Sequence, residues 1–282
     1  MNIGDFLRAA FLITWRYKWM WLVGFLLSPQ LLGESIYKFN YLPGEEIPWE
    51  QLLAVVLLAG FIGVVMFIAS ILINPALILA AVRAQRNEPV TVGGCFRDGS
   101  EYFVRYLLLA LTWLGISLAV VIMLVIPLLI AAVIHLLLLI VVALFFVPVL
   151  IAVAVVIYAV GCHSYRSLVL ENLPVLDALQ RGYALFKSRL WPSVGLAVVA
   201  LLITLAISVP LTLLVMIPQQ ILTQLAGEGT LALLVKYGFS LLISIPVYGY
   251  LGAWNSNLWT VAYEAWFGPP VTSTDTSTPT IF

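Results

Sequence analysis

A long stretch without a formal charge runs from Tyr106 to Cys162 and contains 57 residues. A membrane-spanning helix needs about 20 mainly apolar residues, so this stretch is too long for a single span. It fits two helices of about 25 residues each, joined by a tight turn near the midpoint. The stretch therefore predicts a helical hairpin in a membrane.

The composition predicts the same class for the whole chain. It is 63% hydrophobic and 9% charged, against a charged share of about 25% in soluble domains. These values exclude a soluble domain and a disordered chain. Basic and acidic residues number 13 each, so no basic field for nucleic acid exists. The prediction is an all-α, polytopic membrane protein that does not bind nucleic acid.

Six spans can be placed along the chain by length and hydropathy. They lie near residues 18–33, 52–81, 106–130, 138–162, 193–217 and 237–263. Together they predict one transmembrane domain over residues 1–267, followed by a Thr-, Ser- and Pro-rich cytoplasmic tail over 268–282. Such a tail is expected to be disordered when free and ordered by something outside itself.

The basic residues predict the orientation of these spans. Eleven of the 13 Lys and Arg residues fall on one side of the predicted membrane, leaving Lys38 and Lys236 opposite. By the positive-inside rule, both termini are cytoplasmic. Two cysteines without a disulfide framework, and no Asn-x-Ser/Thr sequon, suit the plasma membrane of a bacterium or an archaeon, and the cytoplasmic membrane of a bacterium is the expectation.

A threefold quasi-repeat is also indicated. Each unit would consist of a capping residue, an amphipathic helix on the cytoplasmic face and a membrane hairpin. The amphipathic helices are predicted near residues 3–17, 91–104 and 175–190. Asp5, Thr91 and Asp177 open the three units, and Asp177 is expected to cap its helix after Pro174 stops the preceding chain.

The third amphipathic helix is predicted to place polar residues on one face and an apolar stripe on the other, formed by Leu176, Leu179, Tyr183, Phe186 and Leu190. Such a helix lies in the headgroup layer with its basic face toward anionic lipid; alternatively, it is an elbow that only connects two spans. On the first interpretation, the candidate headgroup contacts at the predicted cytoplasmic interface are Arg16, Lys18, Arg105, Arg181, Lys187 and Arg189.

One segment carries a family resemblance. In residues 167–187 an apolar run leads through Glu171 and a short break to Ala178-Leu, Arg181 and an aromatic residue. This pattern resembles bacterial six-span proteins that are similar to the membrane domain of glycerophosphodiester phosphodiesterases. The resemblance implies an accessory or regulatory membrane domain, because catalysis in such phosphodiesterases belongs to a separate soluble barrel. It therefore implies an architecture and no activity.

No catalytic constellation is visible, so the chain is not expected to be an enzyme. Glu171 is the one carboxylate that suggests a catalytic role, but a structural ion pair with the neighbouring Arg166 explains its presence better. Cys95, Cys162 and His163 are a weak zinc signal, and no metal site is predicted.

The two histidines leave a cofactor question open. His135 is expected in the turn between the third and fourth spans, and His163 at the inner end of the fourth span. Either imidazole could ligate a tetrapyrrole pigment or haem. The alternative is a histidine at the membrane interface, and no cofactor is predicted otherwise.

Polar residues within the spans admit two interpretations. Asn74, Asn255 and Asn257 are the best candidates for contact with a solute or lipid. The alternative is helix packing, since Asn74 lies on a stripe of small residues in the second span. A second stripe, Gly249, Ala253, Ser256 and Thr260, lies on the sixth span. Small residues let helices approach closely, and an Asn beside them donates across the interface.

The sequence supports two candidate functions. The first is a non-catalytic accessory or scaffold subunit, whose partners are other membrane protein subunits and membrane lipids. The second is a carrier or regulator that handles a lipid or small solute. A cavity lined by Asn74 and Asn255 would support the second.

Overall fold

The computed structural model describes residues 2–25, 49–226 and 230–268. Helices account for 92% of these residues, and none of them lies in a strand, which confirms the all-α prediction. The helices, in chain order, are α1 (Ile3–Arg16), α2 (Trp19–Phe25), α4 (Trp49–Gln85), α5 (Val92–Ser100), α6 (Phe103–Ile134), α7 (Leu136–Leu170), α8 (Val175–Ser188), α9 (Leu190–Ala226) and α10 (Thr230–Phe267).

Four of the described helices are long and apolar enough to cross a membrane. They are Val56–Gln85, Phe103–Ile134, Leu136–Leu170 and Leu190–Pro218, and they coincide with the second to fifth predicted spans. The sixth predicted span, 237–263, falls within α10. The first begins in α2, but its part from residue 26 onward lies outside the described residues, as do residues 269–282 of the tail.

The hairpin predicted in the uncharged stretch is present. α6 ends at Ile134 and α7 begins at Leu136, so His135 alone forms the turn. Its backbone is extended, with φ −167° and ψ 139°, which breaks the helical path. The Leu137 N–H donates to His135 Nδ1 over 3.1 Å, so the imidazole satisfies a donor that a helix N-terminus leaves unpaired.

Three short helices occupy the predicted amphipathic segments, but their capping differs from the prediction. The N-cap residues of α1 and α8 are Asn2 and Pro174. Asp5 and Asp177 lie three positions further on, where Asp5 Oδ2 accepts from the Asn2 N–H over 2.9 Å. The prediction that Asp177 caps α8 was therefore wrong. Thr91 does cap α5, which is shorter than predicted because α6 already begins at Phe103.

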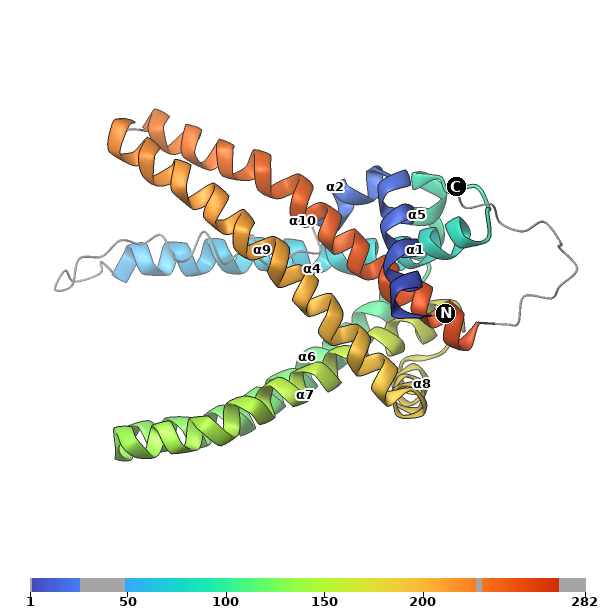
Figure 1. Cartoon of the computed structure of the whole chain (residues 1–282), viewed down its shortest axis with the longest axis horizontal. Coiled ribbons are helices and arrows are strands. Elements are labelled where there is room, and N and C mark those ends of the chain that lie inside the picture. The colour runs from blue at the N-terminus through green and yellow to red at the C-terminus, as the bar shows by residue number, and fades with distance from the viewer. Residues whose placement is uncertain (1, 26–48, 227–229, 269–282) are drawn as a thin grey trace, which may run out of the picture.

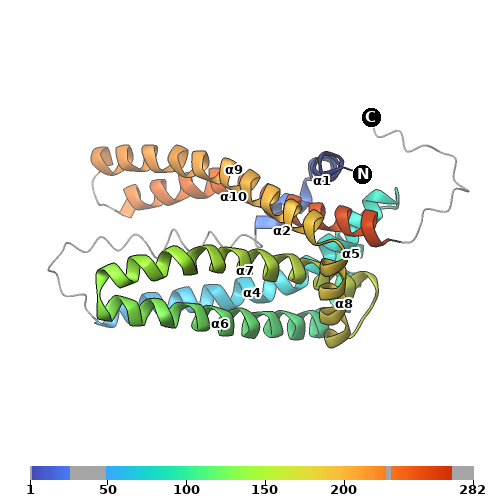
Figure 2. The same cartoon turned by 60° about the horizontal axis from the view of Figure 1, so that its bottom comes forward.

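The short helices gather at one end of the long helices, which diverge from that end (Figures 1 and 2). Each short helix packs on a long one: α5 on α4, α8 on α7, and α1 on α10. The long helices α4, α7 and α10 also contact one another pairwise. Contacts between helices far apart in the sequence are thus concentrated near the short helices.

The closest helix approach joins α2 to α10. A Cβ atom added at Gly249 would lie 2.0 Å from the carbonyl oxygen of Trp21, and one added at Gly24 would lie 2.2 Å from the carbonyl oxygen of Gly249. Only glycine permits backbones to approach so closely. Helix packing is therefore the role of Gly249 in the predicted stripe on the sixth span.

Candidate functional site

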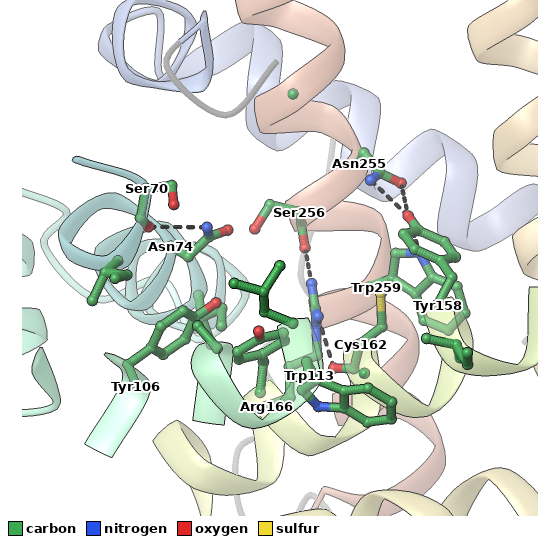
Figure 3. Close-up of a pocket in the computed structure, with 18 of the residues that line it drawn as sticks. Ser70, Asn74, Tyr106, Trp113, Tyr158, Cys162, Arg166, Asn255, Ser256 and Trp259 are labelled. Carbon is green, nitrogen blue, oxygen red and sulfur yellow. Dashed lines mark hydrogen bonds between the residues drawn. The ribbon is translucent and has the colours of Figure 1, made fainter. Parts of the chain in front are cut away.

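A cavity of about 460 Å³ lies between α4, α6, α7 and α10 (Figure 3). Small-molecule sites usually measure about 300–1,000 Å³. The cavity is lined by Phe67, Ser70, Ile71, Asn74, Ile78, Tyr106, Ala110, Trp113, Leu114, Ser117, Ile157, Tyr158, Gly161, Cys162, Tyr165, Arg166, Gly252, Asn255, Ser256 and Trp259. All four helices contribute their portions near the short helices, so the cavity lies toward that end of the molecule.

Asn255 of α10 lies in a polar cluster on the cavity wall. Its amide nitrogen and oxygen lie 2.7 Å and 3.0 Å from the Tyr158 hydroxyl of α7. The indole N–H of the buried Trp259 donates to the same hydroxyl over 3.1 Å. These contacts hold the Asn255 amide at the cavity, where Figure 3 shows it beside Tyr158.

Asn74 lines the cavity from α4. Its amide nitrogen donates to the Ser70 carbonyl one turn earlier on the same helix, over 3.0 Å. The amide oxygen has no partner among the described residues and therefore keeps acceptor capacity. The structure thus brings Asn74 and Asn255, 181 residues apart in the sequence, to one cavity.

Asn257 does not belong to the cavity. It is fully buried, and its amide nitrogen donates to Thr14 Oγ1 of α1 over 2.8 Å. Met20 Sδ of α2 lies 3.5 Å from the same nitrogen. Of the three candidate asparagines, Asn257 therefore has the helix-packing role, since it ties α10 to α1 and α2.

Arg166 is the one charged side chain among the described residues of the cavity wall. It is 5% exposed and donates three hydrogen bonds, of which two link α7 to α10. Nη2 donates to the Ser256 carbonyl over 2.7 Å, Nη1 to the Cys162 carbonyl over 2.8 Å, and Nε to Thr260 Oγ1 over 3.2 Å. No Asp or Glu lines the cavity in the part of the chain that the structure describes.

The expected pairing of Glu171 with Arg166 was wrong. In the structure α7 continues to Leu170 and carries Arg166 inside the packed region. Glu171 pairs instead with Arg181 of α8 over 3.0 Å and accepts from the Tyr263 hydroxyl. The apolar residues 168–170 that follow Arg166 were the available signal that the helix continues past the charge.

Aromatic rings form much of the remaining wall. Tyr106 of α6 stacks on Tyr165 of α7, with ring centroids 4.6 Å apart and planes at 24°. Trp113 lies across from Gly161, whose added Cβ would be 3.7 Å from the indole. The cavity therefore combines one cation and several neutral hydrogen-bonding groups with apolar and aromatic walls.

The structure separates the two histidines. His163 is fully buried, and its Nε2 lies 3.0 Å from Ser193 Oγ of α9. Its ring meets Trp259 edge-on at 5.5 Å and Phe267 at 5.8 Å. His135 is exposed at the opposite end of α7. Neither lines the cavity, and tetrapyrrole ligation by either imidazole stays a prediction.

Neither cysteine belongs to a metal-binding group in the part of the chain that the structure describes. Cys162 lines the cavity. Cys95 of α5 is buried, and burial raises the pKa of its thiol. The nearby Arg83 of α4 donates to Asp98 of α5, and this hydrogen bond lowers the pKa of the Asp98 carboxyl. The Arg83–Asp98 ion pair fixes α5 on α4.

The six candidate headgroup contacts fall into two groups. Arg105 donates to the Asn172 side chain over 2.9 Å, and Arg181 pairs with Glu171. The other four are exposed and form no ion pair with another described residue. They are Arg16, Lys18, Lys187 and Arg189.

The apolar face of α8 is shared between the protein and its surroundings. Phe186 and the small residues Ala178 and Gly182 are buried against neighbouring helices. Leu176 and Tyr183, which belong to the predicted apolar stripe, are 69% and 58% exposed. The stripe is therefore only partly used for packing within the chain.

No family model, curated protein or solved structure matches the chain. The likeness to the membrane domain of glycerophosphodiester phosphodiesterases accordingly stays a prediction from residues 167–187.

Proposed function

We propose that the chain is a multi-pass membrane protein that binds a lipid or small solute in the cavity between α4, α6, α7 and α10, as a carrier or a regulator of membrane lipids. The observation that carries this proposal is that Asn74, Asn255 and Arg166 line one cavity. Polar and ionisable groups at membrane depth are costly, and their convergence on a cavity favours a ligand site.

We further propose six spans, including one that begins in α2 and one in α10, with both termini cytoplasmic. The exposed cations Arg16, Lys18, Lys187 and Arg189 lie at the end where α1 and α8 sit, which supports that end as the cytoplasmic headgroup layer. The exposed Leu176 and Tyr183 of α8 support insertion into that layer.

The contacts also support three quasi-repeats. The short helix of each unit packs on the last long helix of the preceding unit, so α5 packs on α4 and α8 packs on α7. The short helix of the first unit, α1, packs on α10, the last long helix of the third unit. Related units arranged in this way place the last helix of each at the centre. The cavity between α4, α7 and α10 is thus a product of the arrangement.

Ligand binding is tested with Asn255→Leu, which removes the amide from the cavity wall. The matched control is Thr212→Leu, since Thr212 is exposed on α9 and its hydroxyl donates to the Ser208 carbonyl of its own helix. Lipids retained after gentle detergent extraction are identified by native mass spectrometry, and lipid and solute flux is measured in liposomes. Loss of ligand or flux in Asn255→Leu alone supports the proposal; wild-type behaviour of both variants contradicts it.

A second candidate function is that of an accessory or scaffold subunit. The outer part of the α6–α7 hairpin supports it, because Val133, Leu144 and Phe145 are 89%, 72% and 68% exposed. Such an apolar surface is available to lipid or to other membrane subunits. Native mass spectrometry of the gently extracted protein tests this function, since a lone monomer without partner subunits would contradict it.

A further inference from the structure

The charge of Arg166 lacks a counter-ion among the described residues. Arg83 and Arg181 each pair with a carboxylate. Arg166 is far less exposed than either, and its hydrogen-bond partners among the described residues are two carbonyl oxygens and one hydroxyl. A guanidinium stays protonated in proteins and carries five N–H donors, so the three bonds leave two donors over.

A buried cation without an anion is unfavourable, because neutral acceptors replace only part of its hydration. The three neutral acceptors hold the guanidinium in place on α7 and α10 without neutralising it. Because Arg166 lines a cavity of about 460 Å³, an anion that enters this cavity would lie beside the uncompensated charge. Arginine suits this role, since its planar fork of donors matches the oxygens of phosphate and carboxylate groups.

The remainder of the wall matches an amphipathic anion. Asn74 and Asn255 bring amide groups to the cavity, and Trp113 and Trp259 bring apolar rings. The cavity also lies near the end of the molecule that carries the short helices and the exposed cations. A lipid whose headgroup sits at this level could place its charge at Arg166 and its chain along the apolar wall.

We propose that the cavity is an oxyanion-binding site in which Arg166 is the counter-ion of a phosphate or carboxylate group. This inference rests on the proposed function and names the chemical class of the ligand. The oxyanion has two sources, an anionic lipid headgroup or a free anion, and the experiment separates them.

The test uses the full chain, delipidated in a neutral detergent. Four probes are titrated: dioleoyl phosphatidic acid, dioleoylglycerol with the same chains and no phosphate, glycerol 3-phosphate, and inorganic phosphate. Tryptophan fluorescence reports affinity, and native mass spectrometry reports stoichiometry. We expect phosphatidic acid to bind one to one, at least about tenfold more tightly than dioleoylglycerol. Binding of the two soluble phosphates as tight as that of the lipid supports the oxyanion site with a free anion as its source.

Arg166→Gln is expected to weaken phosphate binding about tenfold or more, because it removes a charge-assisted hydrogen-bond donor. The matched control is Arg8→Gln, since Arg8 is an exposed cation of α1 outside the cavity. If Arg166→Gln fails to fold, Ser117→Trp serves instead, because it fills the cavity from α6 without changing a charge. It is expected to abolish binding of phosphatidic acid.

Three outcomes would overturn the inference. Equal binding of dioleoylglycerol and phosphatidic acid would show a neutral ligand, which refutes the oxyanion site but leaves the proposed function standing. Phosphatidic acid binding that Arg8→Gln weakens as much as Arg166→Gln would show a surface charge effect. Absence of any bound lipid or probe, with Asn255→Leu behaving as wild type, would refute the inference and the proposed function together.

Discussion

The close approach of α2 to α10 makes a quantitative prediction for Gly249→Ala. The added Cβ would lie 2.0 Å from the carbonyl oxygen of Trp21 and 2.9 Å from its carbonyl carbon. Ordinary contact begins at 3.4 Å, so the two backbones must separate by 1.4 Å, the difference between 3.4 and 2.0. Both opposing atoms belong to helix backbone and cannot move aside as the end of a flexible side chain could.

The magnitude follows from two opposing effects. Forcing an additional carbon into a packed interface costs about 1–3 kcal/mol, and the backbone clash here places Gly249→Ala near the upper value. Alanine gains about 1 kcal/mol over glycine from helix propensity. The expected net loss of stability is about 2 kcal/mol, which lowers the melting midpoint by roughly 4–8 °C.

The assay is thermal unfolding in detergent, followed by tryptophan fluorescence, with Gly115→Ala as the matched control. Gly115 lies inside α6 with nothing within 4 Å of an added Cβ, so this variant gains helix propensity without a clash. It should melt at or slightly above the wild-type temperature. If Gly249→Ala is as stable as Gly115→Ala, α2 and α10 do not approach as closely as described.

Three further predictions concern hydrogen bonds and the cofactor question. The Arg83 hydrogen bond lowers the pKa of Asp98, so its stabilisation is present above the unfolded pKa of about 3.9 and disappears as the pH falls through the lower folded value. Melting midpoints across pH should therefore show Asp98→Asn below wild type at pH 7 and equal to it in acid; a constant difference would contradict this. Thr14→Val removes the acceptor of buried Asn257 and should cost about 1–3 kcal/mol, measured as a drop in melting midpoint that Thr212→Val does not show. Tetrapyrrole ligation by His163 requires a visible absorption band in purified protein that is lost in His163→Phe, and a colourless preparation contradicts it.

Local sequence properties were sufficient for the helices themselves. The uncharged stretch broke at His135, within two residues of its midpoint, and the three short helices formed in the predicted amphipathic segments. Hydropathy and spacing determine these features because a helix satisfies its backbone hydrogen bonds within its own segment. The stripe of small residues on the sixth predicted span likewise predicted that α10 has a closely packed face. It did not predict which helix packs on that face.

The cavity and its charge were decided only by the tertiary structure. Asn74 and Asn255 were candidates from their residue type, but Asn257, two positions from Asn255, proved to be a packing residue because it faces α1 and α2. Arg166 was missed because the sequence cannot show that α10 covers its side chain. Whether a polar group binds a ligand or a neighbouring helix depends on which helices meet, and the helices around this cavity come together from distant parts of the chain.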